Sequence, residues 1–110
     1  MSNYAYGRNA EARVGRELVN SIKGASFTRT RGSRTPADVH VTVNGVPLFA
    51  IQVKSSRANT KTTNKNSITD RSKLINYSYL IKQYPLTANL KGRKMEIRDA
   101  MSDKLLFLNY

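Results

Sequence analysis

Three polar side chains interrupt two apolar segments near the middle of the chain. Residues 35–56 read TPADVHVTVNGVPLFAIQVKSS, with Asp38, Gln52 and Lys54 among valine, leucine, phenylalanine and isoleucine. A carboxylate and an amide carbonyl are oxygen ligands of the kind that Mg²⁺ prefers. An ammonium group beside them can stabilise negative charge that develops in a reaction. Taken singly, Asp38 reads as a strand-start cap and Lys54 as a lysine that snorkels at a strand end, so the chemistry requires all three together.

The pattern around these side chains predicts a β-hairpin. Residues 39–43 alternate valine with polar residues, which is typical of a strand with one buried face. The dipeptide Asn44-Gly45 is typical of a tight turn. Residues 48–54 then predict the return strand, so both segments that carry the polar side chains belong to one antiparallel pair.

The register of this hairpin decides whether the polar side chains meet. A two-residue turn would place Asp38 on the apolar face of the return strand, because opposed residues share a face. A three-residue loop over residues 44–46, or an equivalent bulge, places Asp38 opposite Gln52 and separates an apolar face from a polar one. We therefore predict the odd loop or the bulge, with Asp38, Gln52 and Lys54 clustered at one end of one face.

A helix is predicted before the hairpin, over residues 8–23, with Gly24 as its stop. Glu11 falls within the arc of its apolar stripe, whereas Arg13 and Arg16 fall on the opposite side. The stripe repeats every four residues and consists of Ala10, Val14, Leu18 and Ile22. This spacing turns the Glu11 carboxylate inward, toward whatever the helix packs against.

The rest of the chain supplies further elements around the same core. Residues 26–31 predict a short strand, and residues 55–70 are polar and basic, which is typical of a mobile loop. A second helix is predicted over residues 74–84, with Pro85 as its stop. Two closing strands are predicted from KMEIRDA and KLLFLNY at the carboxyl end.

Length and charge bound the possible functions. The chain has 110 residues, no cysteine and one histidine, so we expect a single domain with neither a disulfide framework nor a thiolate metal site. Nineteen Lys and Arg against seven Asp and Glu give a net charge of +12, which favours a polyanion such as nucleic acid as the partner. No apolar run approaches the ~20 residues of a membrane-spanning helix. We expect no membrane association and a cytoplasmic location, or the host cytoplasm if the source is viral.

Three stretches together resemble a known family. They are GRNAE (residues 7–11), GSRTPADVHV (residues 32–41) and LFAIQVKSS (residues 48–56). Their order is similar to that of the archaeal Holliday junction resolvases and their viral relatives, within the PD-(D/E)xK nuclease superfamily. The resemblance covers about the first half of the chain. It implies an α/β, restriction-endonuclease-like fold with a mixed central sheet flanked by helices in a single domain, and Mg²⁺-dependent hydrolysis of phosphodiesters, with Mn²⁺ as a possible substitute.

The resemblance also implies roles for individual residues. Asp38 matches the metal-binding aspartate and Lys54 the catalytic lysine of the family. Glu11 matches a helical glutamate that assists at the metal, and Ser33 matches a loop serine near the scissile phosphate. Gln52 occupies a position where aspartate or glutamate is usual, and its carbonyl oxygen can still coordinate a metal ion although it lacks the charge.

The first helix departs from the family in length. It is about one turn longer than usual between the matched glutamate and Phe27. Alignment backward from Phe27 would place Gly15 at the key position, in which case Glu17 is the alternative to Glu11 as the helix ligand.

Affinity for DNA is expected from basic residues near the matched loop and in the polar segment after the hairpin. The favoured substrate is a Holliday junction, the favoured assembly is a homodimer, and both follow from the resemblance. The alternatives are a nuclease of the same fold that acts on flaps, nicks or single strands, and a non-catalytic DNA-binding module. The candidate phosphate contacts are Arg8, Arg29, Arg31, Arg34, Arg57, Lys61 and Lys65.

Overall fold

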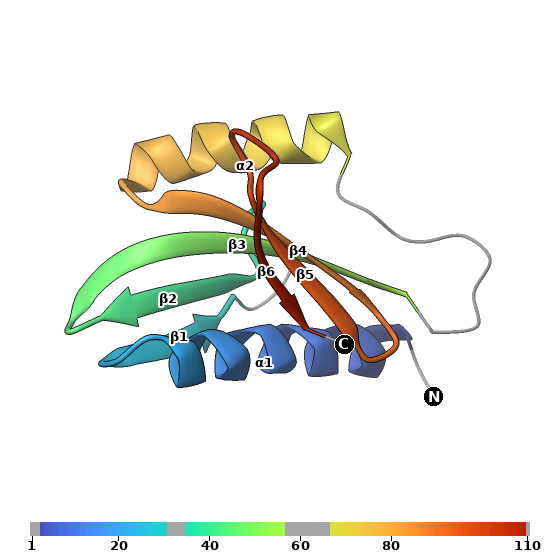
Figure 1. The fold of residues 1–110 in the computed structure, drawn as a ribbon. Coiled ribbons are helices and arrows are strands. Elements are labelled where there is room, and N and C mark those ends of the chain that lie inside the picture. Colours follow the sequence, from blue (N-terminus) through green and yellow to red (C-terminus); the bar gives the residue numbers. More distant parts are fainter. Residues whose placement is uncertain (1–2, 31–34, 57–66, 110) are drawn as a thin grey trace.

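A computed structural model describes residues 3–30, 35–56 and 67–109, with side chains described from residue 9 onward. Two helices and six strands make up these residues (Figure 1). In chain order they are α1 (Asn3–Ser21), β1 (Ala25–Arg29), β2 (Val39–Val43), β3 (Val46–Ser56), α2 (Ile68–Ile81), β4 (Tyr84–Lys91), β5 (Lys94–Asp99) and β6 (Leu105–Asn109).

The six strands form one sheet in the order β1-β2-β3-β4-β5-β6. Only β3 and β4 run parallel, and α2 connects them, whereas every other neighbouring pair is antiparallel. The two helices lie on opposite faces of the sheet, with α1 along one face and α2 along the other (Figure 1). The expected α/β fold, a mixed central sheet flanked by helices in one domain, is confirmed.

The hairpin between β2 and β3 uses a two-residue turn together with a bulge. Val43 pairs with Val46 across the turn, but the register shifts after Thr42, so that Val41 pairs with Phe49 and Val39 with Ile51. The three-residue loop of the sequence analysis was wrong, and the equivalent bulge was correct. Beyond the bulge the register is the predicted one, because one extra residue in β3 restores the separation of apolar and polar faces.

The face of the sheet toward α1 carries the larger core. Ala10, Val14 and Leu18 of α1 are buried there, as the predicted stripe requires. Gly15 packs directly on Phe27 of β1, since an added Cβ would lie 2.3 Å from the ring. The strand residues of this core are Val39, Val41, Ile51, Leu86, Ala88, Leu90, Met95 and Ile97. The helix itself starts earlier than predicted, at Asn3, and ends at Ser21.

The opposite face packs against α2 through a smaller cluster. Leu74 of α2 is fully buried there with Ala37, Ala50 and Ala100. The helix begins at Ile68, six residues before the predicted start, because Ser67 and Asp70 form a capping box at its amino end. It ends at Ile81, before the predicted residue 84.

The ends of the predicted loop over residues 55–70 belong to regular elements. β3 continues through Ser56, and α2 begins at Ile68. The remainder of that predicted loop, residues 57–66, lies outside the described residues. β4 follows α2 directly and was not predicted; it occupies the position beside β3 at the centre of the sheet.

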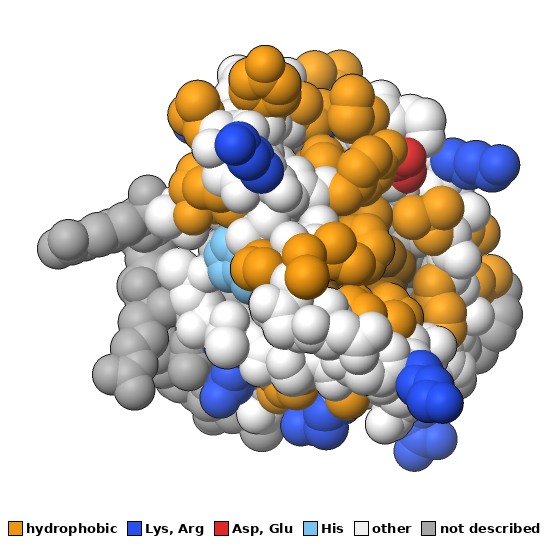
Figure 2. All heavy atoms as spheres, turned by 90° about the vertical axis from the view of Figure 1, so that its left-hand side faces the viewer, with side chains coloured by type: hydrophobic (Ala, Val, Ile, Leu, Met, Phe, Trp, Pro, Cys, Tyr) orange, Lys and Arg blue, Asp and Glu red, His pale blue; other side chains and the backbone are white. Residues whose placement is uncertain are grey.

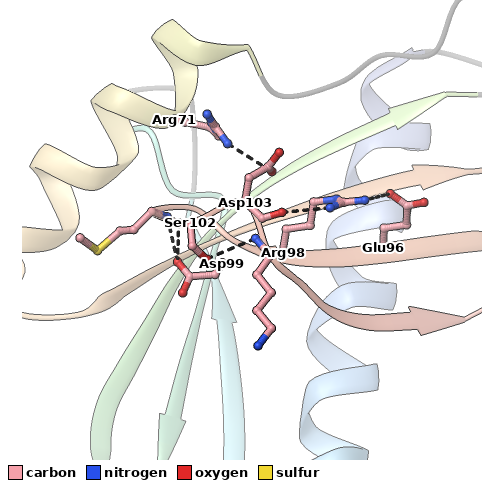
Figure 3. Close-up of polar contacts among 8 residues, drawn as sticks. Arg71, Glu96, Arg98, Asp99, Ser102 and Asp103 are labelled. Atoms are coloured by element: carbon pink, nitrogen blue, oxygen red, sulfur yellow. Dashed lines mark hydrogen bonds and ion pairs between the residues drawn. The ribbon is translucent and has the colours of Figure 1, made fainter.

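The two predicted closing strands are confirmed as β5 and β6. The turn between them is tied to α2, because Arg71 Nη1 lies 3.2 Å from Asp103 Oδ1 (Figure 3). Within the same turn Arg98 donates to the Asp103 carbonyl at 3.0 Å. These contacts hold the end of the sheet against the second helix.

Exposed apolar side chains gather on one side of the molecule. Val46 and Leu48 of the hairpin, Tyr79 and Leu80 of α2 and Tyr84 of β4 are all exposed. Their segments lie together at the left of Figure 1, and Figure 2 shows that side with apolar side chains over much of it. Separately, neither described helix is long and apolar enough to span a bilayer.

Candidate active site

Asp38 lies immediately before β2, at the point where β2 and β3 stop pairing. Its backbone N–H donates to the Ile51 carbonyl at 2.8 Å, and its own carbonyl accepts from Thr30 at 2.9 Å. Its carboxylate Oδ2 accepts a hydrogen bond from the Val53 backbone N–H at 2.8 Å. The carboxylate is thereby held against the backbone of β3, between the two other polar residues of the predicted cluster.

Gln52 and Lys54 lie on the same face of β3, two residues apart. The observed pairing of Val39 with Ile51, extended by one residue, places Asp38 opposite Gln52. Ala50, two residues earlier, belongs to the cluster packed on α2, so Gln52 and Lys54 share the α2-facing side. The predicted grouping of Asp38, Gln52 and Lys54 on one face is therefore what the register produces.

Gln52 is buried to an unusual degree for a glutamine. The residue is only 9% exposed, and its Oε1 atom is buried without a hydrogen-bond partner among the described residues. A buried carbonyl without a partner costs about 1–3 kcal/mol, and the great majority of such atoms in folded proteins are satisfied. An oxygen ligand held ready for a cation is one physical account of this atom.

The electrostatics of Asp38 agree with that account. Burial raises the pKa of this carboxyl above its ordinary value, against the opposing effects of the Val53 hydrogen bond and the charge of Lys54. The ammonium of Lys54 is therefore close enough to act on Asp38. A desolvated carboxylate with incomplete compensation is a favourable ligand for a divalent cation.

Glu11 lies on α1, which covers the face of the sheet opposite to the α2-facing side of Gln52 and Lys54 (Figure 1). It follows the buried Ala10 on α1, it is half-buried, and its Oε1 atom is fully covered. The inward orientation predicted from the stripe is thus observed, while its assistance at a metal ion stays a prediction. The alternative ligand Glu17 accepts a hydrogen bond from Asn109 of β6 at 3.3 Å. The choice between Glu11 and Glu17 as the helix ligand stays a prediction.

Most of the predicted DNA contacts and one catalytic candidate lie outside the described side chains. Ser33 lies outside the described residues, and Arg8 belongs to α1 with its side chain not described. Arg29 is exposed at the end of β1, where it pairs with Val39 beside Asp38. The other candidates outside the described residues are Arg31, Arg34, Arg57, Lys61 and Lys65.

Two further groups near this site were not predicted from the sequence. Asp70 in the first turn of α2 has a lowered pKa, chiefly because of its hydrogen bonds with Ser67, and the charge of Lys54 contributes. The Ser67-x-x-Asp70 capping pattern could have placed that acid at a helix start. Thr87 of β4 is buried directly beside Gln52 in the parallel register, and only recognition of β4 would have found it.

His40 belongs to a neighbouring contact on the same face. Its Nδ1 atom lies 2.8 Å from Gln83 Oε1, and its ring meets the Tyr77 ring edge-on at 6.5 Å between centroids. The described contacts of His40 are thus with Gln83 and Tyr77.

The donor set fits Mg²⁺ or Mn²⁺ better than zinc. No group of three His, Cys, Asp or Glu side chains gathers within the part of the chain that the structure describes. Zinc sites usually need such a set, whereas Mg²⁺ takes one or two carboxylates and keeps several waters. Asp38 and the Gln52 oxygen, which has no hydrogen-bond partner among the described residues, are compatible with the second requirement.

The comparisons with known proteins bear on the fold. No protein-family model and no curated protein matches the sequence significantly. The structure is similar to that of Hjc, a Holliday junction resolvase from the archaeal hyperthermophile Archaeoglobus fulgidus. The likeness has a TM-score of 0.63 and covers 94% of this chain and 87% of that chain, at 18% sequence identity. This chain shares the fold of a Holliday junction resolvase. The resemblance noted from the sequence is thus confirmed at the level of the fold.

Proposed function

We propose that this protein is a metal-dependent, structure-selective DNA endonuclease whose favoured substrate is a four-way junction. The observation that carries the proposal is the grouping of Asp38, Gln52 and Lys54 on one face of the sheet, with the Gln52 oxygen buried and without a hydrogen-bond partner among the described residues. The fold shared with Hjc supports the same reading. The net charge of +12 suits a phosphodiester polyanion.

In the proposed reaction, water hydrolyses a phosphodiester. The water oxygen bonds to phosphorus, the bond to the leaving oxygen breaks, and the leaving oxygen takes up a proton. Asp38 and Gln52 would hold Mg²⁺ or Mn²⁺, with Glu11 completing the set directly or through water. Such an ion, when bound, polarises the phosphate and lowers the pKa of water.

Each of the protein groups has a proposed role in this reaction. Lys54 would place its ammonium beside the phosphate and stabilise the charge that builds on its oxygens. The Val53 N–H fixes the Asp38 carboxylate, so the ligand loses little conformational freedom when it binds a cation. Ser33 stays a proposed contact of the scissile phosphate.

A second copy of the chain is the proposed partner at the exposed apolar side. Scattered apolar side chains need no explanation, but a gathered set marks an interaction surface. Val46 and Lys54 are eight residues apart along β3, or about 26 Å at ~3.3 Å per residue, so a dimer formed there leaves the candidate site open. We propose that the protein is located in the cytoplasm of a cell or of a viral host.

Two other functions remain as candidates. A nuclease of the same fold could prefer flaps, nicks or single strands, because a fold does not determine a substrate. A non-catalytic DNA-binding module is favoured by one observation, the amide at position 52 in place of an acid. Both are separated from the leading proposal by cleavage data.

The test is a cleavage assay on labelled four-way junction, flap and linear duplex, each with Mg²⁺, Mn²⁺ or EDTA. We expect cleavage of the junction with either metal and none with EDTA. Lys54→Ala should lower the cleavage rate by about 10²-fold or more while junction binding persists, and Lys82→Ala, at the exposed end of α2, should match the wild type. Tight binding without cleavage of any substrate in either metal would establish the non-catalytic module.

A further inference from the structure

A basic turn lies beside the candidate site, one strand away. The β3–β4 register pairs Ser56 with Lys91, and the β4–β5 register pairs Lys91 with Lys94. The backbone N–H of Gly92 also donates to the Ser56 carbonyl at 3.0 Å. The turn is therefore joined to the end of β3 only two residues beyond Lys54.

The two lysines of this turn, Lys91 and Lys94, share a face with Lys54. Residues paired across neighbouring strands point to the same side of a sheet, and alternate residues along a strand point to opposite sides. Leu90 of β4 and Met95 of β5 are buried in the core against α1. Lys91 and Lys94, each adjacent to one of these residues, accordingly point to the same side as Lys54.

The turn is held in place by Arg13 of α1. Arg13 Nη1 donates to the Gly92 carbonyl at 2.8 Å, and Nη2 donates to the Arg93 carbonyl at 3.0 Å. Figure 1 shows this turn beside α1, away from α2. The guanidinium of Arg13 is used for these two bonds, so it positions the turn, while the side chain of Arg93 is exposed to solvent. A fixed turn loses little freedom on binding.

The local charge balance is positive. Glu96 of β5 is an acid on this face, and it pairs with Lys94 at 3.2 Å. It also pairs with Arg98 at 3.5 Å, the contact drawn in Figure 3. Lys91 and Arg93 add two further cations beside Lys54. Adjacent strands lie ~4.8 Å apart and alternate residues ~6.6 Å apart, which is roughly one to two times the ~3.4 Å of helix axis per phosphate along one DNA strand.

We infer that Lys91, Arg93 and Lys94, here called the basic rim, form a phosphate-binding track that carries a DNA backbone away from the candidate active site. The inference rests on the proposed function, since it takes DNA as the partner. The rim lies two residues beyond Lys54 along the sheet, because Lys91 and Lys94 are in register with Ser56 of β3. An acidic protein could in principle meet the same cations, but it would not need them beside a hydrolytic lysine.

The experiment compares two triple variants of equal charge change. The first is Lys91→Gln/Arg93→Gln/Lys94→Gln. The control is Lys23→Gln/Lys82→Gln/Lys104→Gln, which removes three exposed cations from other elements. Junction binding is measured by fluorescence anisotropy between 50 and 300 mM salt, and circular dichroism melts verify that both variants fold. A parallel arm titrates polyglutamate as competitor.

We expect the rim variant to bind junction DNA at least about 10-fold more weakly at ~0.1 M salt than the control. Its salt dependence should be shallower by about two units of slope, at ~0.9 per lost phosphate contact. Equal affinity and slope in the two variants would overturn the inference, as would competition by polyglutamate as effective as by DNA of equal charge. If the wild type binds junction DNA but never cuts it, the proposed nuclease activity is wrong, and the same titrations still decide the inference about the basic rim. If the wild type does not bind DNA, both the proposed nuclease activity and the basic-rim inference are wrong.

Discussion

The two faces of β3 have opposite character. On the side toward α1, Ile51 is fully buried among aliphatic residues of both layers. On the side toward α2, Gln52 is almost as deeply buried, yet its carbonyl oxygen has no hydrogen-bond partner among the described residues. One strand therefore carries a packed core on one face and incompletely satisfied polar groups on the other. Such local departures from good packing are expected at functional sites.

The contrast separates stability from chemistry. The apolar face uses interchangeable aliphatic groups whose contribution scales with buried area. The polar face depends on particular atoms: the Asp38 carboxylate fixed by Val53, the Gln52 oxygen and the Lys54 ammonium. Substitutions on the two faces should thus change different measurements.

Ile51→Ala should give the largest loss of stability. Truncation of a fully buried isoleucine removes apolar contacts and leaves a cavity, which costs about 2–5 kcal/mol. Urea unfolding followed by circular dichroism measures the loss. Ile51→Val is the matched control and should cost about 0.5–1.5 kcal/mol. A loss below that of the valine variant would show that this face is not the principal core.

The amino-acid sequence was sufficient to predict much of this contrast between the apolar and polar faces of β3. Alternating valines, the inward Glu11 and the polar end of the hairpin were all read from periodicity, because a strand repeats every two residues and a helix every 3.6. Even the register was predicted, since only one register separates apolar from polar residues. The bulge that produces it could not be distinguished from a longer loop, because both restore the same pairing.

What the sequence did not reveal depends on long-range pairing. β4 begins with Tyr84-Pro85, which reads locally as the end of a helix, yet the strand is buried at the centre of the sheet. A parallel neighbour of β3 can be recognised only when the crossover through α2 is known. For the same reason the basic rim, which depends on the β3–β4 and β4–β5 registers, was not predicted.

Gln52→Glu should change the polar face more than any other single substitution there. It adds a buried carboxylate opposite Asp38, and two adjacent carboxylates raise each other's pKa. For an acid whose folded pKa is raised, the destabilisation is absent below the unfolded pKa and complete above the folded pKa. We expect a Tm about 4–8 °C lower at pH 8 without metal, the equivalent of ~1 kcal/mol, and little change at pH 4.

Mg²⁺ decides whether that substitution acts at a metal site. It should raise the Tm of Gln52→Glu more than that of the wild type, because the added charge strengthens cation binding. Thermal melts over a Mg²⁺ titration measure this shift, with Ca²⁺-free buffers throughout. Equal shifts in both proteins would show that position 52 does not contact the cation.

Gln52→Leu gives the complementary result. It replaces the unpartnered carbonyl with an apolar group of similar size, so stability should stay equal or rise by about 1 kcal/mol. Cleavage of junction DNA should be lost, because one proposed cation ligand is absent. A variant that unfolds more readily than the wild type would show that the Gln52 amide supports the fold and not a cation.

Asp38→Asn should produce the smallest and most diagnostic shift. Burial raises the pKa of Asp38, against the Val53 hydrogen bond and the Lys54 charge, so its ionised form destabilises the fold above that pKa. Asparagine keeps an oxygen that can accept from the Val53 N–H. We expect the variant to melt about 2–4 °C above the wild type at pH 7, with the difference vanishing near pH 3.

Asp70→Asn is the control of opposite sign, since hydrogen bonds with Ser67 lower the pKa of Asp70 and its charge stabilises the fold at neutral pH. If Asp38→Asn melts below the wild type at pH 7, the Asp38–Lys54 attraction exceeds the cost of burial, and the carboxylate is then a structural ion-pair partner.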